Sequence, residues 1–253
     1  MTLRWPFARA RRPTKAPPEG APKLAVLGAM RSGTNLVRRL VEKHWEISAG
    51  FSSYGWKHAG VPIFSPDSGL SYPSVPILFV VKNPYASVVS LFRYRMLAIT
   101  RGHRVSIEGG ETPETFLTSP ITVFDSQLPG SPRLRFANPV QYWNFVYCNL
   151  EMLDPGRFRV RGLNYEDLLA DPERLRVVEK LAGLPAAPGA ISLPAAATGR
   201  DTDKAAMRGD GGAFDASYYR NHIYLEELSP SQIAFIGEQV DPWLMQRRGY
   251  RRF

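Results

Sequence analysis

The sequence predicts an α/β fold, a three-layer sandwich in which helices flank a central, mostly parallel sheet. Residues 24–27 and 77–81 are short, wholly apolar runs, which are typical of parallel strands covered on both faces. A segment with helical periodicity follows each run. Strands that alternate with helices in this way form parallel βαβ units, so these observations together favour the α/β class.

The first half of the chain predicts three strands and two helices. The strand at 24–27 ends at Gly28, and a helix is expected after Gly33. The buried face of this helix is marked by Leu36, Val37, Leu40 and Val41. A second strand is expected near residues 52–58. The third strand, at 77–81, precedes Asn83 and Pro84, an N-cap and a first-position proline, so a helix is expected to about residue 98.

The second half predicts a long insert followed by further helices and one strand. Residues 99–137 are rich in Gly, Pro, Ser and Thr and are expected to form an irregular, variable insert, either a functional loop or lid or a partly disordered stretch. The later elements are expected as a helix near 139–153, a strand at 158–165, a helix at 172–183, a loop at 184–215 and a last helix from Ser229 to just before Gly249.

The composition predicts one domain over residues 23–253. The chain has 253 residues, of which 44% are hydrophobic. A folded chain of this length buries roughly 70–75% of its unfolded surface. The single cysteine, Cys148, excludes an intrachain disulfide and agrees with the reducing cytosol, so a cytoplasmic protein is expected. The histidines and Cys148 have no metal-ligand spacing, so no metal is expected. No apolar run reaches the roughly 18–20 residues of a membrane span.

The net charge of +9 indicates an anionic partner, such as nucleic acid, a membrane surface or a phosphate- or sulfate-bearing ligand. Residues 1–23 hold six basic residues against one acid, so the remainder carries only +4. This mild charge argues against nucleic acid. Residues 1–22, which are basic and rich in proline, are predicted to be a disordered arm, either a solvated tail or a peripheral membrane contact.

The loop between the first strand and helix predicts an anion site. Gly28 and Gly33 have the GxxxxG spacing of a nucleotide phosphate loop, in which backbone N–H groups and the helix dipole bind anions. This spacing favours a P-loop-NTPase-like arrangement. An ATPase or kinase loop has lysine after the second glycine, whereas Thr34 stands there and the cation is Arg31.

Residues 30–36, Met-Arg-Ser-Gly-Thr-Asn-Leu, resemble the 5′-phosphosulfate loop of sulfotransferases that use 3′-phosphoadenosine 5′-phosphosulfate (PAPS). The resemblance implies a P-loop-like sulfotransferase fold. It also implies that the loop binds the 5′ end of PAPS and that Arg31 stabilises the bridging oxygen during transfer. The cofactor-binding residues that it implies here are Arg31, Ser32, Gly33, Thr34 and Asn35.

Residues 80–84 followed by Ser90 resemble the 3′-phosphate motif of the same family. The motif has a basic residue at the strand end, here Lys82, and a serine eight residues on. Both positions face the ligand at the carboxyl end of a parallel sheet. The family more often has arginine in place of Lys82 and aspartate in place of Ala86. Lysine keeps the charge but loses the two-pronged guanidinium contact.

Two later segments extend the resemblance, so that the main matches span residues 24–184 in family order. Residues 164–172 resemble the strand-to-helix segment whose tyrosine borders the adenine, which implies that role for Tyr165. Arg208 and Gly209 resemble, more loosely, a basic-glycine loop that closes on the 3′-phosphate.

The resemblance implies transfer of a sulfuryl group from PAPS to an acceptor hydroxyl, of a glycan or a small molecule, or to an amine. An acceptor hydroxyl needs a base. His58 is the favoured candidate because it follows the expected second strand, and Glu42 and Glu46 are the alternatives. A P-loop kinase or NTPase, or a nucleotide-binding relative without catalysis, are the alternative functions.

Overall fold

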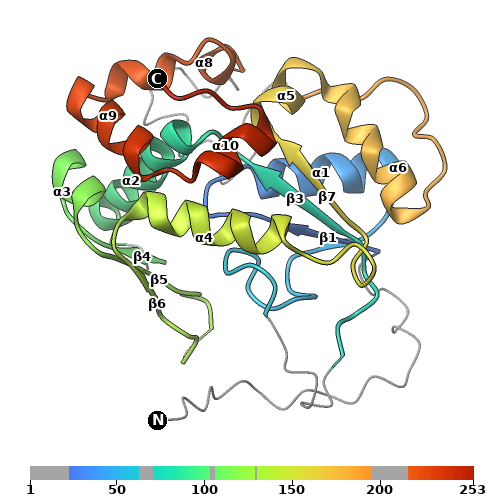
Figure 1. Cartoon of the computed structure of the whole chain (residues 1–253). Coiled ribbons are helices and arrows are strands. Elements are labelled where there is room, and N and C mark those ends of the chain that lie inside the picture. The colour runs from blue at the N-terminus through green and yellow to red at the C-terminus, as the bar shows by residue number, and fades with distance from the viewer. Residues whose placement is uncertain (1–22, 63–70, 103–105, 129, 195–215) are drawn as a thin grey trace.

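A computed structural model describes residues 23–62, 71–102, 106–128, 130–194 and 216–253 (Figure 1). The arm predicted for residues 1–22 lies outside the described residues, as do Arg208 and Gly209.

The central sheet has four parallel strands in the order β2-β1-β3-β7. Its strands are β1 (Leu24–Leu27), β2 (Ala49–Gly50), β3 (Ile77–Val81) and β7 (Val160–Asn164). From β1 the chain passes first to β2 on one side and then to β3 on the other. The loops after β1 and β3 therefore leave the same edge at the point where the strand order reverses, the usual place for a ligand in such sheets.

Helices cover both faces of this sheet, which confirms the predicted α/β class (Figure 1). On one side lie α1 (Thr34–Trp45) and α6 (Val177–Ala182), and on the other lie α4 (Pro139–Glu151) and α10 (Pro242–Arg248). All residues of β1 and β3 are buried, as their unbroken apolar sequence predicts.

Two predicted helix starts are confirmed, the one after β3 and the one at Ser229. The Asn83 side chain accepts from the Tyr85 N–H at 3.1 Å and caps α2 (Pro84–Thr100). Ser229 and Gln232 form a capping box at the start of α9 (Pro230–Gln239). No helix in the described part of the chain, the 17-residue α2 included, is long and apolar enough to cross a membrane.

The strand predicted near residues 52–58 is wrong. The strand at this edge is the two-residue β2, and residues 52–58 form turns. Here the backbone carbonyls accept hydrogen bonds from the loop after β1 and from α4 instead of from a neighbouring strand. The Lys57 carbonyl accepts from the Gly28 N–H at 3.1 Å, and the His58 carbonyl accepts from the Tyr142 hydroxyl at 2.9 Å.

The prediction that residues 99–137 are irregular is also wrong, because they contain a small antiparallel sheet. Its strands are β4 (Ile107–Glu108), β5 (Ile121–Val123) and β6 (Leu134–Phe136), and α3 (Pro113–Thr118) lies between the first two. Strands of two or three residues are too short for a period-two pattern to stand out among glycines and prolines.

Three further boundaries differ from prediction. The strand expected at 158–165 is β7, and Tyr165 opens α5 (Tyr165–Ala170) instead of ending the strand. The helix expected at 172–183 begins as the 3₁₀ helix η2 (Pro172–Arg176). The last helix is two helices, because Pro242 cannot donate a backbone hydrogen bond and starts α10 after the Asp241 cap.

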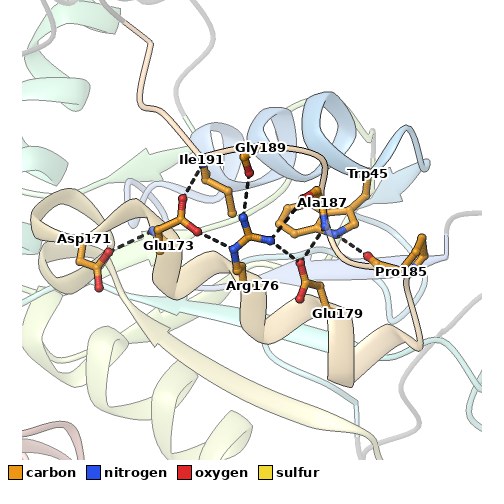
Figure 2. A network of polar contacts seen from close by, with 9 residues as sticks. All are labelled: Trp45, Asp171, Glu173, Arg176, Glu179, Pro185, Ala187, Gly189 and Ile191. Carbon is orange, nitrogen blue, oxygen red and sulfur yellow. Dashed lines mark hydrogen bonds and ion pairs between the residues drawn. The ribbon is translucent and has the colours of Figure 1, made fainter.

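A polar network fastens the segment 185–191 to η2, α6 and α1 (Figure 2). Arg176 is its centre and donates to Glu179 Oε1 at 3.0 Å and to the Gly189 carbonyl at 2.8 Å. The Trp45 indole, at the end of α1, donates to the Pro185 carbonyl at 3.2 Å. The side chains of its ion pairs are 22–43% exposed, so the pairs contribute little to stability and serve to fix this loop.

Candidate functional site

The loop of residues 28–33 fits closely against β3 and α5. A Cβ on Gly28 (φ +151°) would lie 2.5 Å from the Val80 carbonyl oxygen. A Cβ on Gly33 (φ +95°) would lie 2.3 Å from the Tyr165 ring. Both positions therefore require glycine, and the loop predicted to bind the 5′ end of the ligand is packed directly on Tyr165.

Two buried tyrosines of α4 hold the start of this loop. The Tyr147 hydroxyl accepts from the Ala29 N–H at 3.3 Å and donates to the Val80 carbonyl at 2.9 Å. The Tyr142 hydroxyl accepts from the Met30 N–H at 2.9 Å. These bonds fix the loop before any ligand is present.

Helix α1 starts from Gly33 without a side-chain cap in the described part of the chain. Its first-turn N–H groups include those of Thr34 and Asn35, and none of its first-turn residues is acidic. The N-terminus of a helix carries partial positive charge and unsatisfied N–H donors. This end of α1 is therefore suited to an anion that comes from outside the protein.

Arg31 adds a full positive charge to the loop. It has a left-handed backbone (φ +68°), and its guanidinium carbon lies 5.4 Å from the centre of the Tyr94 ring. Its buried Nε has no hydrogen-bond partner among the described residues. A buried donor without a partner is costly, so an anion that accepts from it would be favoured.

Lys82 and Ser90, which the sequence paired by spacing, are in contact. Lys82 is buried at the end of β3, and its Nζ donates to Ser90 Oγ at 3.3 Å. The same Nζ lies 4.7 Å from the centre of the Tyr165 ring. Burial lowers the pKa of Lys82, and the Arg31 charge acts in the same direction. Tyr165 thus connects this pair to Gly33.

Tyr219 and Glu166 are site neighbours that sequence reasoning missed. Tyr219 lies in α8 (Ser217–Arg220), and its hydroxyl is 3.4 Å from Lys82 Nζ. The Glu166 carboxylate accepts from the Asn83 N–H at 3.0 Å and from the Tyr250 hydroxyl at 2.8 Å, and burial raises its pKa. Glu166 directly follows the predicted site residue Tyr165, and this position could have indicated it. No motif in the sequence marks Tyr219.

Asn35 and Lys57 meet at the outer edge of the loop. Lys57 Nζ donates to Asn35 Oδ1 at 2.9 Å and lies 3.4 Å from the centre of the Phe51 ring. The side chain of Asn35 therefore faces Lys57. The turn at 52–58, which replaced the expected strand, brings this second cation to the start of α1.

His58 contacts the first residue of the same loop, where its Nδ1 is 2.7 Å from the Gly28 carbonyl oxygen. Because a carbonyl oxygen only accepts, Nδ1 carries the proton and Nε2 of the neutral ring is the basic nitrogen. Burial lowers the pKa of His58 to about 3, and the charges of Lys57 and Arg31 add to this effect. The ring is therefore neutral near pH 7.

The two alternative bases lie away from the loop. Glu42 Oε1 accepts from Arg38 Nε at 2.8 Å in the third turn of α1. Glu46 follows the last residue of α1, which is 12 residues long, so it is about 18 Å along the axis from the end that meets the loop. Of the three candidates, the structure brings only His58 to the loop.

Metal-ligating side chains do not gather in the described residues: no group of three or more His, Cys, Asp and Glu is close enough to hold an ion. The thiol of Cys148 faces Asp241 Oδ2 at 3.8 Å, and burial raises its pKa to about 11. A thiol with that pKa is a poor nucleophile near pH 7.

Replacing His58 with Gln should reduce the pH dependence of stability. The unfolded chain gains a proton on His58 below its ordinary pKa of 6.5, whereas the folded chain does so only near pH 3. Wild-type stability therefore falls as the pH drops from 6.5 toward 3, by at most about 2 kcal/mol at pH 5 for this group. Thermal melts of both proteins at pH 5 and 7.5 measure the difference. Identical pH dependences would contradict the neutral ring.

Comparison with known proteins finds similarity among solved structures. No family model matches the chain, and no curated protein sequence matches it. A solved structure described as a sulfotransferase domain from the curacin biosynthetic pathway is similar over 71% of this chain, with 16% sequence identity and a TM-score of 0.32. The chain spans 55% of the length of that domain.

Proposed function

We propose that this protein is a sulfotransferase that moves a sulfuryl group from PAPS to an acceptor hydroxyl, of a glycan or a small molecule, or to an amine. The observation that carries the proposal is the position of Tyr165. Its ring packs on Gly33 of the loop and lies against Lys82 of the Lys82–Ser90 pair. The sequence predicts the loop and the Lys82–Ser90 pair as two separate anion-binding features. Both contact the Tyr165 ring, as the binding of one nucleotide with phosphates at its 3′ and 5′ positions requires.

The residues present fit such a nucleotide. At the 5′ end, the uncapped start of α1 and the unpartnered Nε of Arg31 are suited to a phosphosulfate. At the 3′ end, Lys82 supplies a charge and Ser90 a hydroxyl. Between them, the Tyr165 ring can border a base. The missing Lys after Gly33 argues against a nucleotide triphosphate at the same loop.

When bound, PAPS supplies an activated sulfuryl group whose transfer leaves negative charge on the bridging oxygen. In this proposal Arg31, a residue of the loop itself, stabilises that charge. In this proposal His58 Nε2 accepts the acceptor's proton, while Nδ1 stays bonded to the Gly28 carbonyl. A polyanion beside Lys57 and Arg31 offsets two of the charges that lower the pKa of His58, and so makes it a stronger base.

Calorimetric titration with 3′,5′-adenosine bisphosphate, the product nucleotide, tests the proposal. We expect the purified protein to bind it and to bind ATP with Mg²⁺ far more weakly. Tight binding of ATP with Mg²⁺ alone would instead indicate a P-loop kinase or NTPase. If neither nucleotide binds, the proposed function is wrong.

A further inference from the structure

Lys82 is a buried cation that is stabilised without an ion pair in the described part of the chain. It is 3% exposed, and the hydrogen-bond partners of its Nζ there are two hydroxyl groups, those of Ser90 and Tyr219. The charge of the Glu166 carboxylate favours the charged form of Lys82. A buried ammonium group needs compensation, so these neighbours have to supply it.

Two tyrosine rings and the two hydroxyls form a cage around Nζ. The ring centres of Tyr219 and Tyr165 lie 4.4 and 4.7 Å away. The Tyr219 hydroxyl is 3.4 Å from Nζ and the Ser90 hydroxyl 3.3 Å. Tyr219 is thus the single residue that contributes both a ring and a hydroxyl.

A cage of this kind stabilises a positive charge and leaves it unneutralised. Aromatic faces attract a cation through their quadrupole, whereas a carboxylate partner would cancel its charge. Both hydroxyl oxygens accept from the ammonium, so their own protons are directed away from it. A dianion beside the cage meets one positive charge and two hydroxyl donors. Charge-assisted hydrogen bonds of this kind are the strong ones.

Tyr219 is also built into the site. It is 9% exposed, and its ring stands edge-on to Tyr165 with the ring centres 5.1 Å apart at 88°. It therefore supports the ring that packs on Gly33. Loss of the whole side chain would disturb several contacts, whereas loss of the hydroxyl alone keeps the ring.

We propose that Tyr219 is a specificity-determining residue for the 3′-phosphate, and that with Lys82 and Ser90 it forms a three-point clamp for a phosphate monoester dianion. This inference rests on the proposed function. The clamp distinguishes nucleotides that carry a 3′-phosphate from those that lack it. Its hydroxyl and ring have separate roles: the hydroxyl donates to the phosphate, and the ring keeps Lys82 charged.

The test compares Tyr219→Phe with Tyr218→Phe in calorimetric titrations with 3′,5′-adenosine bisphosphate and with AMP. Tyr218 is the matched control, because its hydroxyl bonds to Glu227 instead of to Lys82. We expect Tyr219→Phe to weaken bisphosphate binding about tenfold. AMP binding should stay unchanged, as should both affinities of Tyr218→Phe. Thermal melts check that each variant is folded.

The outcomes separate this inference from the function on which it rests. If wild type binds bisphosphate no better than AMP, the donor site itself is wrong and both proposals are overturned. If wild type prefers bisphosphate and Tyr219→Phe keeps the full preference, the clamp is overturned while the proposed function stands. Equal weakening of both ligands would show that Tyr219 acts through packing, which also overturns the clamp.

Discussion

Arg31→Ala is expected to lower the turnover of the sulfotransferase reaction by about 10²–10³-fold, the effect of removing one preorganised donor from a developing oxyanion. Affinity for 3′,5′-adenosine bisphosphate should fall less than about tenfold, because a group that acts mainly in the transition state contributes little to ground-state binding. Steady-state kinetics with PAPS and a model acceptor, together with calorimetry, measure the two effects.

Two control variants make the Arg31 result specific. Arg31→Lys keeps the charge without the planar guanidinium, so we expect it to recover part of the lost turnover. Arg38→Ala removes an arginine from α1 that is paired with Glu42 away from the loop, and it should keep full turnover. Unchanged turnover in Arg31→Ala would remove Arg31 from the chemistry. An inactive wild type that still binds bisphosphate would indicate a nucleotide-binding relative without catalysis.

The parts of the fold that sequence reasoning predicted are those with local causes. The strands at 24–27 and 77–81 are continuous apolar runs, and the starts of α2 and α9 are set by Asn83 and Ser229 through bonds to the next two or three residues. Each signal lies within a few residues of the structure it specifies. Lys82 and Ser90, eight residues apart, were paired by the 3′-phosphate motif that they resemble, and their side chains are in contact.

The parts that were missed depend on contacts between distant segments. Residues 52–58 form turns because their carbonyl groups accept hydrogen bonds from the loop after β1 and from Tyr142. Neither donor is near in sequence. Tyr219 reaches Lys82 from the far end of the chain, with no motif around it. Tyr147 is indistinguishable from a core residue until its hydroxyl is seen between Ala29 and Val80. Tertiary hydrogen bonds of this kind have no period or spacing to detect.

Gly33→Ala is expected to have the largest effect on stability at the site, because it meets two obstacles. A side chain at φ +95° is strained, and the new Cβ would lie 2.3–2.4 Å from two carbon atoms of the Tyr165 ring. The strain costs about 1–2 kcal/mol, and displacement of a buried ring adds about 1–3 kcal/mol. Because the same ring borders Lys82, bisphosphate binding should fall more than tenfold. Urea unfolding and calorimetry measure both effects.

Gly55→Ala and a double variant separate the strain from the contact. Gly55 has nearly the same backbone angle, φ +93°, and a Cβ there meets nothing within 4 Å, so its replacement by Ala should cost the strain alone. In a Tyr165→Ala background the ring is gone, and Gly33→Ala should then cost no more than Gly55→Ala does. An undiminished cost in that background would show that the Tyr165 ring does not set the requirement for glycine. The packing of the loop on Tyr165, on which the proposed donor site depends, would then be wrong.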